Sequence, residues 1–254
     1  MKAAVRLLPA LLACGIACAA PQAAPQQDEA GVVRVNAIRN PELRSYRAIV
    51  AGMDTFDRLH TLAPAVPQLL FQVRGTRGGP LEGAAPELKL AADDLTIRVT
   101  LDEQARFGLP RSQAAWDAKA ELMFNRRQRE VQALPYIRTP GLAENRRRLG
   151  DLRLTCQVQV AIAKEELSFV WVAALDAMLL TGDWCNWFNG EEKRGGQKRA
   201  WAAYADAPLA AATLREGERS LALAVKARAF SVPLGDAGWS DDAVVELEYA
   251  PAAP

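Results

Sequence analysis

Few residues in this 254-residue chain could do acid–base or metal chemistry. It holds one histidine, His60, and it contains no HExxH zinc motif, G-x-S-x-G nucleophile elbow or P-loop. Adjacent acidic residues could serve a two-carboxylate hydrolase, as in Asp93–Asp94, Glu165–Glu166, Glu191–Glu192 and Asp241–Asp242. Each pair falls at a predicted turn or helix start, where acids cap helices and bind water. We therefore expect no catalytic residue, no metal and no cofactor, and we keep a carboxylate-based hydrolase as an alternative.

The N-terminus has the pattern of a secretory signal peptide. A basic start is followed by an apolar run of eleven residues, and Ala17-Cys18-Ala19 offers a cleavage site. The apolar run is too short to span a membrane. We expect a signal peptide over 1–19, a flexible tether over 20–39, and export to the bacterial periplasm. In a competing interpretation Cys14 or Cys18 is lipidated, which would anchor the protein to a membrane, facing the periplasm or the exterior.

The four cysteines divide into two groups. Cys14 and Cys18 belong to the leader, whereas Cys156 and Cys185 belong to the body of the chain. Two cysteines in an exported body indicate one disulfide. A redox pair would need C-x-x-C spacing, and a metal site would need nearby histidines. We therefore predict a Cys156–Cys185 bridge.

An aromatic segment, TGDWCNWFNG, surrounds the second of these cysteines. Exposed indoles with amide neighbours are typical of sugar-binding sites, so the candidate ligand-binding residues are Trp184, Asn186, Trp187 and Asn189. Trp201 is a third indole nearby in the sequence. The competing interpretation, which we favour, is that the indoles close the end of a helix over a sheet and are held there by the disulfide.

The charge balance argues against nucleic-acid binding. Lysine and arginine number 31 against 30 aspartates and glutamates, which gives a net charge of +1. Three basic runs stand out: Arg126-Arg127-x-Arg129, Arg146-Arg147-Arg148, and Lys193-Arg194 through Lys198-Arg199. We interpret them as solvated loops, and an anionic partner such as a phospholipid head group or an acidic polymer is the alternative.

An amphipathic helix is predicted over 40–64. Asn40 is its candidate N-cap and Pro41 its first residue. Apolar residues then recur at three- and four-residue spacing from Leu43 to Leu62. His60, in the last turn, is expected to be a surface or capping residue.

From Pro67 the apolar pattern has a period of two, which is typical of antiparallel strands. The first strand predictions are QLLFQVRG, PELKL, LTIRVTLD, ARFGLP and KAELMFN. Another strand is predicted over 149–162, because six alternate residues are apolar and place Cys156 on a buried face. A mostly buried helix is predicted over 164–180. The remaining strand predictions cover 200–205, 209–215, 220–226, 228–234 and 243–249, with hairpin turns at REGER and VKARA.

Residues 78–110 resemble the carboxypeptidase regulatory-like family. The first seven residues of this segment, 78–84 (GGPLEGA), which include Gly79-Pro80-Leu81-Glu82-Gly83-Ala84, match the Gly-x-Pro-Leu-x-Gly-Ala turn of that family. Residues Asp102 to Phe107 match its acidic turn, with Ala105 where the family has glycine, and LGDLRL at 149–154 could be a closing strand. The resemblance implies a transthyretin-like antiparallel β-sandwich over about 67–155. It implies no activity, because such domains are usually non-catalytic.

Together these patterns predict a mainly β protein with α additions, of the α+β class. The predicted organisation is the helix over 40–64, the sandwich over 67–155, and a helix plus β-rich half over 156–254, either continuous with the sandwich or separate. We expect a non-catalytic binding or assembly module of the cell envelope, with an envelope protein or a glycan as partner and without a transmembrane span. The alternative is a carbohydrate- or peptidoglycan-binding protein that uses the Trp184/Trp187 loop.

Overall fold

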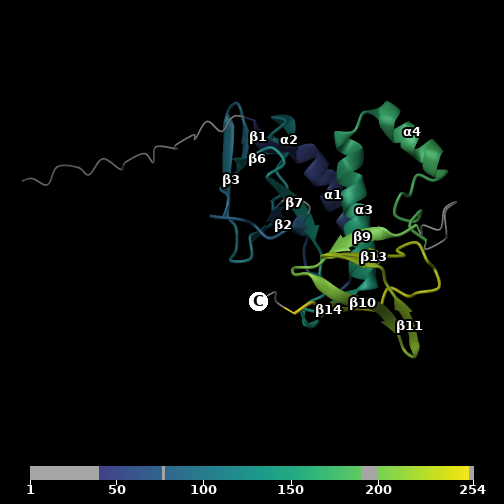
Figure 1. Cartoon of the computed structure of the whole chain (residues 1–254). Coiled ribbons are helices and arrows are strands. Elements are labelled where there is room, and N and C mark those ends of the chain that lie inside the picture. Colours follow the sequence, from purple (N-terminus) through teal and green to yellow (C-terminus); the bar gives the residue numbers. More distant parts are fainter. Residues whose placement is uncertain (1–39, 76–77, 190–198, 252–254) are drawn as a thin grey trace, which may run out of the picture. The chain divides into compact units, whose positions relative to one another are not determined.

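The structure is a computed structural model that describes residues 40–75, 78–189 and 199–251, all within one compact unit, Ala37–Pro254 (Figure 1). The predicted signal peptide and tether, with Cys14 and Cys18, lie outside the described residues, as does the pair Glu191–Glu192. The described part combines antiparallel strands in four sheets with four α-helices. This confirms the predicted α+β class.

Two antiparallel sheets surround the first hydrophobic core. One has the strand order β1-β6-β3-β4 and the other β5-β2-β7. Their strands are β1 (Pro41–Ser45), β2 (Leu70–Gly75), β3 (Leu88–Ala92), β4 (Leu95–Val99), β5 (Arg106–Phe107), β6 (Glu121–Arg127) and β7 (Val131–Tyr136). A short helix, α2 (Gln113–Asp117), connects β5 to β6. The strands predicted between Pro67 and Asn125 are therefore confirmed.

The helix predicted over 40–64 is wrong at its start. Asn40 does not cap a helix, because it has a left-handed φ of 56° and β1 follows it, paired with β6. Helix α1 (Tyr46–Arg58) begins five residues later than Pro41 and leads into a 3₁₀ turn, His60–Leu62. Backbone pairing with β6, a strand distant in sequence, overrides the local helical pattern.

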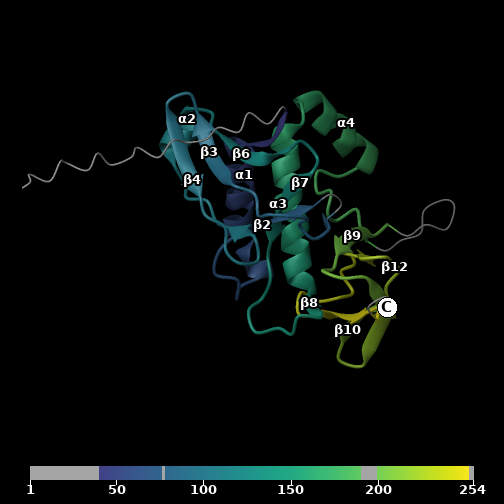
Figure 2. The same cartoon turned by 60° about the vertical axis from the view of Figure 1, so that its left-hand side comes forward.

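Residues 149–162 form a helix, so the strand predicted there is wrong. Helix α3 (Leu149–Glu166) buries apolar residues on two faces. One face packs into the first core, together with α1, through Leu154, Val158 and Ile162. The other face packs into a second core in the C-terminal half, through Leu149, Leu152 and Cys156. In Figure 2, α3 lies with α1 on one side and the C-terminal strands on the other. Two apolar stripes offset by two residues produce the alternation that otherwise indicates a strand.

The second core is built by two more antiparallel sheets, with strand orders β11-β10-β14-β8 and β12-β13-β9. Their strands are β8 (Arg146–Arg148), β9 (Trp201–Tyr204), β10 (Leu209–Glu216), β11 (Arg219–Ala222), β12 (Val225–Lys226), β13 (Ala229–Val232) and β14 (Val244–Tyr249). The C-terminal strand predictions are confirmed except for 220–226, which forms two strands, β11 and β12, in different sheets. Both predicted hairpin turns are confirmed, with Gly217 left-handed between β10 and β11.

The boundary predicted between residues 155 and 156 falls inside α3. The closing strand predicted at 149–154 is part of the same helix, and β8, just before it, pairs with β14 of the C-terminal half. The helix therefore joins the two β-rich halves, because each half needs one of its faces to complete a core.

A candidate docking surface on helix α4

Helix α4 (Phe169–Leu179) presents apolar side chains to solvent. None of its residues is buried. Four large side chains of the helix and that of Leu180, the residue after its end, are between 65% and 91% exposed. The four in the helix are Phe169, Val170, Trp171 and Met178. We call these five residues the α4 surface. An apolar helix is ordinarily buried in a protein core or in a membrane, and large exposed apolar patches are typical of docking surfaces.

The buried helix predicted over 164–180 is therefore wrong in two respects. The chain leaves helical geometry at Leu167, whose ψ is 151°, and α3 and α4 are separate helices. In both views α4 lies beyond the end of α3, away from the β-sheets (Figures 1 and 2). Only one side of α4 is half-buried, and its residues have helical spacing: Val172, Leu175, Asp176 and Leu179.

The inner side of α4 combines three apolar residues with one charged residue, Asp176, which makes polar contacts. Asp176, the only charged residue of the helix, accepts a 2.6 Å hydrogen bond from the indole N–H of Trp184. The Lys164 ammonium lies 3.4 Å from the same Asp176 oxygen and 4.8 Å from the centre of the Trp184 ring, and it donates to the carbonyl of Gly182 at 2.7 Å. Most surface helices keep their charged residues outside, whereas α4 has its one charged residue on the inner side.

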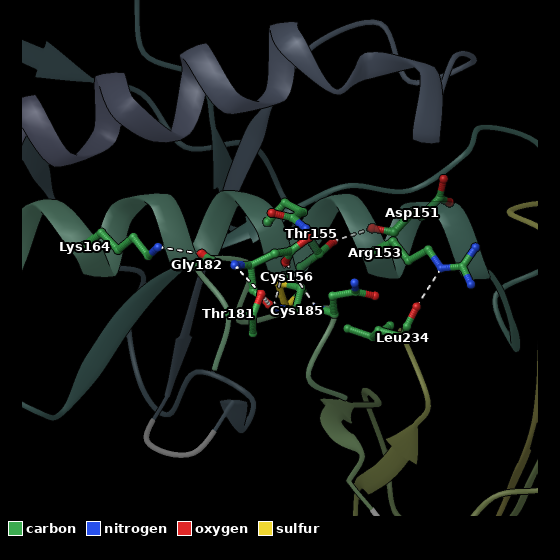
Figure 3. Close-up of a disulfide and its surroundings, with 12 residues drawn as sticks. Asp151, Arg153, Thr155, Cys156, Lys164, Thr181, Gly182, Cys185 and Leu234 are labelled. Atoms are coloured by element: carbon green, nitrogen blue, oxygen red, sulfur yellow. Dashed lines mark hydrogen bonds between the residues drawn. A yellow bond between two sulfur atoms is a disulfide. The ribbon is translucent and has the colours of Figure 1, made fainter. Parts of the chain in front are cut away.

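A disulfide fixes the loop that follows α4. Cys156 of α3 and Cys185 are bonded, which confirms the predicted bridge (Figure 3). Both cysteines are buried in the second core. Next to the bridge, Asp183 accepts hydrogen bonds from the side chain of Gln157 and from the backbone N–H of Cys185. The disulfide and the hydrogen bond from Gln157 therefore hold the loop against α3. In this position the loop places Trp184 under α4.

The loop also lies close to the C-terminal half. Gly235 donates its N–H to the carbonyl of Phe188 at 2.8 Å. A side chain at Gly235 would place its Cβ 2.2 Å from the carbonyl oxygen of Asn186, so only glycine permits this approach. The loop is thus enclosed between α3 and the segment after β13.

The C-terminus of α4 carries an unfavourable residue. Leu180 has a left-handed φ of 55°, and its N–H and that of Thr181 bond to the carbonyls of Ala177 and Asp176. This is the Schellman pattern, in which glycine usually occupies the left-handed position. A leucine there costs about 1 to 2 kcal/mol in backbone energy. Leu180 also exposes its side chain, so neither the backbone nor solvation explains its presence.

The candidate ligand-binding residues lie in this loop, and the two indoles have different surroundings. Trp184 is half-buried under α4, as described above. Trp187 packs edge-on against Phe188, with ring centroids 5.4 Å apart, and the Arg199 guanidinium lies 5.3 Å from its ring. Asn186 is exposed and Asn189 is half-buried. A cation lies against each indole, and sugar binding by Trp184 and Trp187 stays a prediction.

The acidic pairs within the described residues occupy turns and ion pairs. Asp93–Asp94 forms the exposed turn between β3 and β4, and Glu166 pairs with Arg44 at 3.1 Å. Asp241 pairs with Arg153 at 2.6 Å and Asp242 with Arg148 at 2.8 Å. In the described ranges, no three metal-binding side chains form a cluster, and no helix has the length and apolarity to cross a membrane.

The exposure of α4 was not predicted from the sequence, although one signal was present. The run from Phe169 to Leu180 contains one charged residue, which excludes an ordinary surface helix. That signal does not distinguish a helix buried in its own core from one that is exposed for a partner. The sequence also gave no sign that Trp201 lies in a cleft away from the other two indoles.

Comparison of the chain with known proteins finds no matching family model, no matching curated protein and no matching solved structure.

Proposed function

We propose that this chain is an exported, non-catalytic module of the bacterial cell envelope that docks on a membrane through the α4 surface. The observation that carries the proposal is the exposure of α4, whose one charged residue, Asp176, lies on the inner side and whose large apolar side chains lie outside. The predicted signal peptide supports a location where the protein meets a membrane surface.

Lipid suits this surface better than a protein groove does. A helix that binds in a groove normally has an apolar stripe bordered by polar side chains. The outward residues of α4 include no polar side chain, and hydrocarbon accepts a helix that is apolar over its whole free surface. The charged neighbours Lys164 and Glu166 are already paired, with Asp176 and Arg44, so they do not favour an ionic partner.

The dimensions favour an interfacial position. Eleven helical residues extend about 16 Å, roughly half of the hydrocarbon thickness of a bilayer. The helix would therefore lie at the interface, where Phe169 and Trp171 enter the acyl region. One acyl chain alone holds a protein only marginally to a membrane, so lipidation at Cys14 or Cys18 would complement α4 as a second signal.

A vesicle co-sedimentation experiment tests the proposal. The mature protein, produced without acyl modification, is mixed with vesicles of phosphatidylethanolamine and phosphatidylglycerol. Full burial of a large apolar side chain contributes about 1.5 to 3 kcal/mol, so the double variant Phe169→Ser/Trp171→Ser should lose more than a hundredfold in partitioning. The control Leu43→Ser removes an apolar side chain that is 40% exposed on β1, and it should bind as the parent does.

Leu180→Gly is the most discriminating variant. Glycine relieves the left-handed backbone, so the free energy of unfolding should rise by about 1 kcal/mol while vesicle binding falls. A parent protein that does not bind vesicles would overturn the proposal. If that protein instead forms dimers that Phe169→Ser/Trp171→Ser abolishes in sedimentation equilibrium, the α4 surface is a self-association site.

The resemblance to carboxypeptidase regulatory-like domains is a separate proposal for the fold of the range of about 67–155. Six antiparallel strands of this range, β2 to β7, support it, because they belong to two sheets. The turn at Asp102 supports it too, because Ala105 has a φ of 56° at the position where the family has glycine. A domain of this kind would add no activity of its own.

A further inference from the structure

A cleft of about 360 Å³ lies between the two β-rich halves, away from the α4 surface. Strands β2 and β7 form one wall, β9 and β13 form the other, and α3 contributes Leu152, Thr155 and Gln159. The volume is in the range of small-molecule sites and could hold one or two sugar rings.

The cleft has an excess of positive charge. Its lining includes three arginines, Arg74, Arg138 and Arg147, and one acid, Asp206. Asp206 receives a 2.6 Å ion pair from Arg74 and a longer one, 3.4 Å, from Arg147. One carboxylate therefore serves two guanidinium groups, and the third arginine, Arg138, donates to the backbone carbonyl of Ala143.

Arg147 is the most constrained of these charges. Its side chain is only 13% exposed, and burial, followed by repulsion from Arg138, lowers the pKa of its guanidinium. Arg146, the preceding residue on β8, points instead to Glu246 and is half exposed. A second anion in the cleft would offset the repulsion between Arg138 and Arg147.

Aromatic and amide side chains complete the lining. Tyr136, Trp201 and Tyr204 line the cleft, with the Arg106 guanidinium 5.1 Å from the centre of the Tyr136 ring, and Gln132 and Gln159 provide amides that both donate and accept hydrogen bonds. Aromatic faces pack on the C–H face of a sugar ring, amides bind its hydroxyl groups, and arginine binds a carboxylate through two parallel hydrogen bonds.

We infer that this cleft binds an acidic saccharide, a sugar ring that carries a carboxylate. The carboxylate would lie between Arg138 and Arg147, and the ring would contact Trp201 and Tyr136. Asp206 would then be a competing carboxylate, since it already occupies part of the hydrogen-bonding capacity of Arg147. This inference stands independently of membrane docking, because none of the cleft residues belongs to α4.

Isothermal titration calorimetry with glucuronic acid tests the inference, with glucose as the neutral match and acetate as the ring-free anion. Glucuronic acid should bind at least tenfold more tightly than either, and binding should weaken as salt is added. Arg138→Gln and Trp201→Ala should each weaken it at least tenfold. Asp206→Asn should strengthen it several-fold, because it removes the competing carboxylate.

The matched control is Arg146→Gln. Arg146 is next to Arg147 in the sequence but does not line the cleft, so this variant should bind glucuronic acid as tightly as the parent does. Arg138→Lys keeps the charge without the planar fork and should give an intermediate affinity. Thermal melting of each variant verifies that it is folded. Equal affinities for glucuronic acid and glucose, or binding that Arg138→Gln leaves unchanged, would overturn the inference.

Discussion

The indole N–H of Trp184 and the carboxylate of Asp176 form a 2.6 Å hydrogen bond. It joins the disulfide-bonded loop that follows α4 to the inner side of that helix. Lys164 of α3 contacts both partners, at 3.4 Å from the carboxylate oxygen and 4.8 Å from the ring centre. Three segments that are separate in the sequence thus meet at one polar cluster. This cluster is the main polar attachment of a helix that buries none of its residues.

Replacing Trp184 with phenylalanine should loosen α4 while leaving the rest of the fold intact. The variant loses a hydrogen bond to a charged group, which at this half-exposed position is worth about 1 kcal/mol. Hydrogen exchange of the α4 amides should accelerate several-fold, with little change in the global midpoint of denaturation. Trp171→Phe is the control, because that exposed indole should not affect α4 protection. Unchanged exchange in Trp184→Phe would show that the hydrogen bond does not hold the helix.

Removal of the disulfide should destabilise the whole protein. The cysteines are 29 residues apart, and for that loop length the chain-entropy model gives about 3 to 4 kcal/mol. The variant Cys156→Ala/Cys185→Ala should lose this amount in urea denaturation, and protease cleavage within 181–189 should increase. A reducing agent should shift the parent in the same direction and leave the double variant unchanged. A parent whose midpoint is insensitive to reduction would contradict a stabilising role.

Ala105→Gly should stabilise the turn between β4 and β5. Ala105 has a φ of 56°, and Asp102 closes the turn by accepting N–H bonds from Gln104 and Arg106. Glycine adopts this backbone without steric cost, so the free energy of unfolding should rise by about 1 kcal/mol. The control is Ala143→Gly, at an exposed loop position without a positive φ, which should give no gain. Equal effects of the two changes would rule out backbone strain as the cause.

Asp151 should make stability depend on pH. It is fully buried near the start of α3, where it accepts hydrogen bonds from the N–H and the hydroxyl of Thr139. Burial raises its pKa above the ordinary 3.8, against the opposing effect of these bonds and of Arg148 and Arg138. The folded state therefore holds the proton more tightly than the unfolded state does. The contribution of Asp151 to stability is present below a pH of about 3.8, and it is lost as the pH rises through the raised pKa of the folded state.

The variant Asp151→Asn, which does not titrate, isolates this effect. Urea denaturation from pH 3 to pH 7 should show the parent losing stability relative to the variant as pH rises, and the difference should then become constant. A difference that grows in the opposite direction would mean that the pKa of Asp151 is lowered by folding.

Features that depend on composition and on neighbours in the sequence could be predicted. Two cysteines in the body leave one possible pairing, so Cys156–Cys185 followed from counting. The C-terminal strands followed from short alternating runs between turn residues, because a strand that faces one core carries its own periodicity. His60 was expected at the end of a helix, and it lies in the turn after α1 and bonds to the carbonyl of Val66 at 2.7 Å.

Features that depend on what surrounds an element could not be predicted. Leu154 and Cys156 are two residues apart on α3 and face different cores, so a helix between two cores shows the alternation of a strand with one buried face. The sequence of α4 determines that it is apolar, but whether its own protein covers it depends on where α3 ends and how the chain turns at Leu167. The cleft likewise exists only because α3 brings β2 and β7 opposite β9 and β13. Sequence alone determined the apolar face of α1, the apolar character of α4, the disulfide and most strands, while the tertiary structure decided which faces are buried, because burial depends on distant segments.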